Sequence, residues 1–288
     1  MSDQVKGVAS RRHAAVSAAV MAIGRAASET IDRLADAVRY VGGVVYLLVD
    51  SVVWALRGLT NPRYKFGWAA LIAQMVRFGI KSIPIIIIVQ LFIGLILALQ
   101  MAPTLATYGQ LERVAEVVGI AVIRELGPLL TAVVLSGFAG ASIAAEIGAM
   151  VESEEIKALR AHALNPVRFL VVPRLLATTV MIVALAVIAD YVGVLGGFLA
   201  SVFVLDVPPR LYINLTQGAV QTTDFVTGLV KAGVFGAVIV LIASHEGFSV
   251  SGGPEGVGRA TTATVVKSIV ALIGIDALFT AVFYALGI

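Results

Sequence analysis

The sequence has 288 residues, of which 59% are hydrophobic and 14% are charged, and its mean hydropathy is +0.97. Soluble domains carry about 25% charged residues, so this composition excludes a soluble globular protein. The net charge of +3 and the pI near 9.3 do not call for a nucleic-acid partner, because basic loops beside anionic lipid explain both.

We predict an all-α polytopic membrane protein, because the apolar runs are continuous and each is long enough for a helix to cross the hydrocarbon core. Short alternating strands, which form porin-like barrels, do not fit these runs. The positive-inside rule places the N-terminus in the cytoplasm, since eleven of the 21 Lys and Arg precede the first span. With five spans the C-terminus lies outside. The predicted spans are Ser82–Pro103, Leu126–Met150, Leu175–Leu205, Phe225–Ser244 and Ser268–Ile288.

Three regions are predicted along the chain: an N-terminal cytoplasmic tail (1–29), interfacial helices (30–81) and a five-span permease domain (82–288). In the second region a helical projection gathers the polar side chains on one narrow stripe opposite Val, Leu, Ile and Trp. We interpret this pattern as an amphipathic helix in the cytoplasmic interface; a sixth span is the alternative. The stripe consists of Asp32, Asp36, Arg39, Tyr46, Asp50 and Arg57.

The second span carries small residues every four positions, namely Ser136, Gly140, Ala144 and Gly148. Such a face lets helix backbones approach closely in lipid, either within one subunit or between subunits. Arg124 and Glu125 precede this span, and they lie either in the outer interface or inside an extended helix that bends at Gly127-Pro128.

A charged helix is predicted between the second and third spans, at about 151–164. Its acids, Glu154 and Glu155, come first, and its bases, Lys157 and Arg160, follow, as the helix dipole favours. On the cytoplasmic side this helix is a candidate docking surface for a soluble partner; a solvated connector is the alternative.

The sequence contains no Cys, three scattered His and no nucleophile, metal-binding or nucleotide-binding motif, so we predict no catalytic site and no cofactor.

Three charges remain inside predicted spans: Asp190, Lys231 and Asp276. Such residues rarely face lipid, and they pair with one another or line a cavity. Lys231 is the best partner for Asp276, although its side chain could instead extend outward toward Asp224.

Four stretches together resemble the MlaE (YrbE) permease family: RELGPLLTAVVLSGFAGASIAAEIGAM, EEIKALRAHALNPVRFLVVPR, GVGRATTATVV and GIDALFTAVF. The resemblance runs from about Ser82 to the C-terminus. It implies a homodimeric permease subunit of a bacterial ABC transporter that moves phospholipid between the inner membrane and the outer envelope. It also implies a separate P-loop ATPase that binds ATP, usually a STAS-domain protein, and a periplasmic MCE-domain protein.

The resemblance further implies roles for individual residues. Glu146 and the helix Glu155–Ala163 would face the ATPase. A lipid pocket at the dimer axis would be formed by Leu97, Leu105, Tyr108, Arg124, Glu125 and Leu126. There Arg124 could hold a lipid phosphate in a bidentate grip, with Glu125 competing for it. Lys231 and Asp276 match the family, whereas Asp190 does not.

Two alternative functions stay open from the sequence. One is a non-transporting membrane scaffold or regulatory subunit, which would purify without an ATPase. The other is an intramembrane enzyme of lipid metabolism, against which the missing nucleophile argues.

Overall fold

The computed structural model describes residues 31–32, 34–58 and 68–287, and in these ranges all regular structure is helical. The predicted tail (1–29) and positions 59–67 of the predicted interfacial region (30–81) lie outside the described residues. Among the described residues, six helical segments are long and apolar enough to cross a membrane. Five correspond to the predicted spans. The sixth is Leu34–Gly58, so length and composition admit both the interfacial and the spanning placement of this helix.

The chain divides into two units, Met1–Tyr46 and Leu47–Ile288. In the first unit the helix exposes an ion pair in which Arg39 Nη2 lies 2.9 Å from Asp36 Oδ1. The second unit holds the remaining helices. Their bounds are α2 (Trp68–Phe78), α3 (Ile83–Thr107), α4 (Val114–Ala121), α5 (Gly127–Leu135), α6 (Ala141–Glu152), α7 (Glu155–Ala161), α8 (Val172–Phe203), α9 (Pro209–Ala219), α10 (Thr222–Phe248) and α11 (Gly253–Leu286).

Helix α8 is the centre of the second unit and packs against α2, α3, α5 and α10. Its crossing with α3 depends on glycine, because a Cβ on Gly94 would collide with the backbone of Gly193 and a Cβ on Gly196 would collide with the carbonyl of Leu91. Apolar side chains alone give helices no net drive to associate in lipid, so this close backbone approach is what holds the pair together.

The second span is longer than predicted and forms one helical run, Leu111–Glu152, interrupted by two π-helical turns. The first turn, Val122–Leu126, contains Arg124 and Glu125 and directly precedes Gly127-Pro128. The charges therefore lie inside an extended helix rather than beyond its end. From α3, the buried Gln90 donates from Nε2 to the carbonyls of Leu126 and Gly127, at 3.3 Å each, and so ties α3 to this turn.

The small-residue face of the second span packs within the subunit. A Cβ on Gly140 would lie 3.2 Å from Ile239 of α10, and one on Gly148 would lie 2.8 Å from Val250. Of the two readings left open for this face, the structure supports packing against α10 and its following loop.

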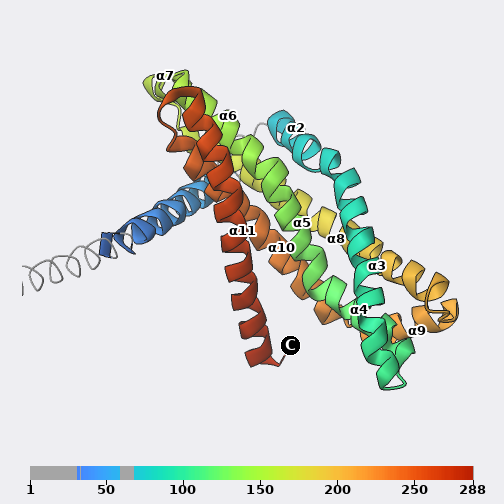
Figure 1. Ribbon diagram of the computed structural model, residues 1–288. Helices are drawn as coiled ribbons and strands as arrows, with labels where there is room; N and C mark the ends of the chain where they lie inside the picture. The colour runs from blue at the N-terminus through green and yellow to red at the C-terminus, as the bar shows by residue number, and fades with distance from the viewer. Residues whose placement is uncertain (1–30, 33, 59–67, 288) are drawn as a thin grey trace, which may run out of the picture. The chain divides into compact units, whose positions relative to one another are not determined.

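The two ends of the second unit have different character. Helices α4 and α9 pack against each other at one end, whereas α6, α7 and the start of α11 lie together at the opposite end (Figure 1). Helix α9 is not among the predicted elements, because at 11 residues it is too short to register as a span. No residue of α11 beyond Leu272 is buried, so its C-terminal half presents an apolar surface.

Candidate functional site

A cluster of charged side chains lies inside the apolar bundle, where the first π-helical turn meets α10 and α11. The adjacent residues of that turn reach different partners, Arg124 contacting Asp224 and Glu125 contacting Lys231. π-Helical turns are rare and often mark functional sites, since they redirect side chains that a regular helix would place elsewhere.

Lys231 is the centre of this cluster and is fully buried. Its Nζ lies 2.6 Å from Oε2 of Glu125 and 3.0 Å from Oδ1 of Asp276. Thr280 links the same groups, accepting a hydrogen bond from Lys231 at 3.2 Å and donating one to Glu125 at 3.0 Å. The structure thus pairs Lys231 with Asp276, as expected, and adds a second carboxylate. The ammonium points inward and does not extend toward Asp224.

Arg124 is held at the rim of the same cluster. Its Nη1 donates to Oδ1 of Asp224 at 3.2 Å, while the other oxygen of Asp224 accepts the backbone N–H of Gln221 at 3.0 Å. Asp224 therefore both caps the start of α10 and positions the guanidinium. Glu125 bonds to Lys231 and Thr280, and its expected competition for Arg124 stays a prediction.

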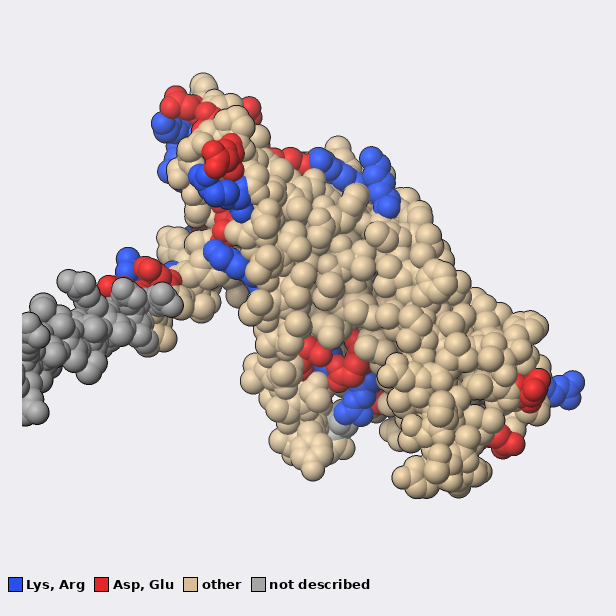
Figure 2. All heavy atoms as spheres, viewed as in Figure 1, with Lys and Arg blue, Asp and Glu red and all other residues tan. Residues whose placement is uncertain are grey.

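This cluster is partly open to the outside. The side chains of Arg124 and Glu125 are each 30% exposed, whereas that of Lys231 is 1% exposed. Figure 2 shows acidic and basic atoms in a hollow beside α11, surrounded by uncharged surface. A guanidinium in such a hollow can bind a phosphate with two parallel hydrogen bonds, and the neighbouring acids limit how tightly an anion is held.

The other residues expected to bind lipid do not converge on one cavity within the described chain. Leu97 and Leu105 are half-buried against the core that α3, α4 and α8 form together. Tyr108 is 75% exposed at the end of α3. Leu126 lies half-buried in the π-helical turn and uses its carbonyl to accept from Gln90. A shared pocket at a dimer axis remains a prediction.

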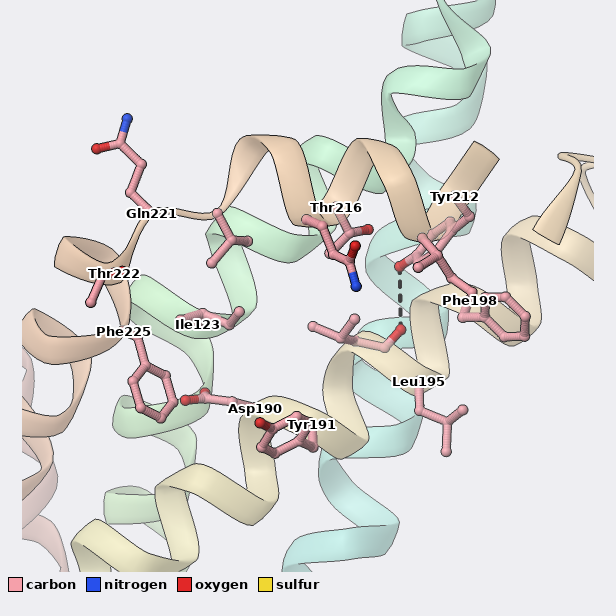
Figure 3. A pocket seen from close by; sticks show the side chains of 14 residues that line it. Ile123, Asp190, Tyr191, Leu195, Phe198, Tyr212, Thr216, Gln221, Thr222 and Phe225 are labelled. Carbon is pink, nitrogen blue, oxygen red and sulfur yellow. Dashed lines mark hydrogen bonds between the residues drawn. The ribbon is translucent and has the colours of Figure 1, made fainter. Parts of the chain in front are cut away.

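Asp190 instead lines a separate cavity of about 710 Å³ between α8, α9 and the start of α10 (Figure 3). One wall is formed by Phe198 and Tyr212, whose rings meet edge to face with centroids 5.5 Å apart. The Tyr212 hydroxyl donates to the carbonyl of Val194 at 3.2 Å. Burial raises the pKa of Tyr212 to about 12, which keeps this hydroxyl protonated.

Glu146, expected to face an ATPase, is held within the chain at the end that carries α7. Its two oxygens form ion pairs with Arg77 of α2 and with Arg174 of α8, the latter at 2.8 Å. Ser142 also donates to Glu146 at 3.4 Å. Glu146 therefore joins three helices, and its expected contact with an ATPase remains a prediction.

The charged helix between the second and third spans exists but is shorter than predicted, α7 covering Glu155–Ala161. Ile156 anchors it, while Glu154, Glu155, Lys157 and Arg160 are exposed. Lys157 bonds to Glu154 at 2.6 Å and holds the pKa of that carboxyl below its usual value. After α7, Oδ1 of Asn165 accepts the N–H of Val167 at 2.9 Å at the start of the next helical segment.

Sequence reasoning missed several members of these sites: Asp224 as the partner of Arg124, Glu125 and Thr280 as partners of Lys231, and the α9 wall of the Asp190 cavity. A seven-residue separation places Asp224 and Lys231 on one face of α10, about 10 Å apart along the axis, and that spacing was the available signal. Among the described residues, no group of three or more His, Asp or Glu could hold a metal ion.

Comparisons with known proteins agree with the motifs. Residues 71–282 match the family model described as Permease MlaE. A probable ABC transporter permease protein of Rickettsia felis is 37% identical over 214 residues, covering 74% of this chain and 83% of the relative. The intermembrane phospholipid transport system permease protein MlaE of Haemophilus influenzae is 29% identical over 253 residues, covering 88% and 95%. The chloroplastic protein TRIGALACTOSYLDIACYLGLYCEROL 1 of Arabidopsis thaliana is 30% identical over 246 residues, covering 82% and 70%. The chain is thus a multi-pass membrane protein that belongs to the MlaE permease family.

Proposed function

We propose that this chain is the membrane subunit of an ABC transporter that moves phospholipid between the inner membrane and the outer envelope of a bacterium. The observation that carries the proposal is the partly exposed Arg124, which Asp224 positions in a hollow of the apolar bundle. Because a phospholipid combines a phosphate with long apolar chains, a guanidinium in this setting suits its headgroup. The family name and the name of the Haemophilus influenzae relative support the same substrate class.

The active form is a homodimer, with lipid between the two copies. One copy leaves the hollow beside α11 open, and the exposed apolar half of α11 offers a surface that a second copy can cover. The MCE-domain protein receives or delivers lipid at the α4–α9 end, and the C-terminus lies on that periplasmic side. We retain the three predicted regions in this proposal: an N-terminal tail (1–29), interfacial helices (30–81) and a five-span domain (82–288).

ATP is bound and hydrolysed by a separate ATPase, which docks at the opposite end on α7. The exposed charges of this short helix and its single buried anchor, Ile156, support that placement. Because Glu146 ties α2, α6 and α8 together next to α7, movement of α7 would be transmitted to the span that carries Arg124. A STAS-domain protein accompanies the ATPase.

The test is reconstitution of the chain with its ATPase and MCE-domain partner in liposomes that contain a fluorescent phospholipid. ATP-dependent transfer of the label to the MCE-domain protein is expected, and Arg124→Ala should reduce it at least about tenfold while the complex stays assembled. ATP hydrolysis without any lipid transfer would contradict the proposal. Failure of this chain to retain an ATPase at all would favour a non-transporting scaffold.

A further inference from the structure

The cavity at Asp190 is chemically unlike the Arg124 cluster, although Ile123 of the same π-helical turn lines it. Asp190 is 2% exposed, and neither of its carboxylate oxygens has a hydrogen-bond partner among the described residues. A carboxyl group at this depth is costly unless it is neutralised or meets a donor. Since no described residue donates to Asp190, we look for the missing partner in a ligand.

The carboxyl group lies at one side of the cavity, between Phe225 and Gly127. Figure 3 shows Asp190 directed toward Phe225 at one side of the cavity. A Cβ on Gly127 would collide with Oδ1 of Asp190, so the second span approaches the carboxylate without offering it a side chain. The hydroxyl of Tyr212 donates its hydrogen bond to the carbonyl of Val194, so it does not donate to Asp190.

The charge of the cavity indicates which charge the ligand should carry. Asp190 is the single charged residue among the described residues that line it, and no Lys or Arg contributes to its walls. A phosphate or carboxylate would therefore meet the charge of Asp190 and no cation. A protonated amine would instead gain a charge-assisted hydrogen bond in an apolar setting, where such bonds are strongest.

The walls and the opening of the cavity indicate the size and polarity of the rest of the ligand. Leu195, Phe198 and Phe225 give an apolar lining, and a volume of about 710 Å³ is in the range of cavities that enclose one small ligand. Tyr191 and Leu195 are 73% and 49% exposed on the side of α8, so the cavity opens onto the apolar surface of the bundle. A ligand that arrives from the lipid phase can enter there.

We propose that this cavity binds a single-chain amphiphile with a protonated amine head, with the ammonium at Asp190 and the chain along Leu195 and Phe198. The site is distinct from the phosphate-binding hollow at Arg124, and it does not depend on the proposed transport of phospholipid. Its occupant is a cationic lipid or lipid-like molecule taken up from the membrane.

The test uses the full-length protein in nanodiscs of phosphatidylcholine, labelled with a dodecylamine that carries a photoreactive diazirine in its chain. Unlabelled dodecylamine, dodecanol and dodecanoate then compete; they share one chain and differ in the head. We expect labelled peptides in α8 and α9, competition by the amine at least about tenfold better than by the alcohol, and none by the carboxylate.

Asp190→Asn should abolish the preference for the amine over the alcohol. Asp206→Asn is the matched control, since Asp206 is an exposed acid outside the cavity, and it should leave the preference unchanged. Leu195→Trp, a change at a half-exposed position, should block labelling by filling the cavity whatever the head. Equal competition by amine and alcohol in the unaltered protein, an amine preference that survives Asp190→Asn, or labelling that Leu195→Trp leaves intact would each overturn the proposal.

Discussion

Lys231 and Asp190 are both charged residues in neighbouring spans and both are almost completely buried, yet their surroundings are opposite. Lys231 contacts two carboxylates and a hydroxyl, which come from two other segments of the chain, the π-helical turn and α11. Asp190 has no partner among the described residues. Burial alone therefore does not reveal the role of a charge in a membrane: a charge with partners holds helices together, whereas one without them is available to a ligand.

The largest effect is expected from Lys231→Met. This change leaves Glu125 and Asp276 facing each other in an apolar site, and breaking a buried ion pair costs about 3–5 kcal/mol. The midpoint of thermal unfolding in a neutral detergent should fall strongly, while the exposed control Lys157→Met should leave it unchanged. Removing all three charges together should restore most of the loss. A triple variant as unstable as Lys231→Met would show that the pairing does not matter.

Asp276→Asn should have a smaller effect than Lys231→Met, because Glu125 remains beside the ammonium. The lost contact is the ion pair at 3.0 Å, and its cost should stay below the roughly 3–5 kcal/mol of breaking a buried pair, since Glu125 still neutralises the ammonium. A double-mutant cycle with Glu125→Gln measures the coupling of the two acids through Lys231. Strictly additive losses in thermal stability would contradict the three-membered arrangement.

Asp190→Asn should act in the opposite direction. No described residue loses a hydrogen bond, and removal of an ionisable group from an apolar site should raise the free energy of unfolding by about 1 kcal/mol in the absence of amphiphilic amines. The same thermal unfolding measurement compares it directly with Asp276→Asn. A destabilisation of similar size in both variants would mean that Asp190 has a partner within the fold.

The smallest effect on stability is expected from the double reversal of Glu154 and Glu155 to Lys. Both side chains are exposed, so unfolding and membrane insertion should not change. Binding of the ATPase should nevertheless weaken, and the amount of ATPase that co-purifies with the chain measures this. An unchanged ratio of ATPase to chain in the double variant would show that α7 is not part of the docking surface.

The fold could be predicted from the sequence to the extent that it depends on local composition. Hydropathy located the five spans, and the charge pattern of 151–164 located α7. The partners within the charged cluster could not be predicted, because they depend on how the π-helical turn Val122–Leu126 rotates Arg124 and Glu125 toward different helices. The Asp190 cavity could not be predicted either, since one of its walls is α9, a helix too short to be recognised as a membrane span.

We propose that Arg124 binds phospholipid in the hollow of the bundle. The most direct measurement places a photocrosslinking amino acid at position 124 of the assembled complex in native membranes, and identifies captured molecules by mass spectrometry. We expect phospholipid adducts at position 124 and none at the exposed control position 157 on α7. A crosslinker at position 124 that captures only protein or water would contradict it.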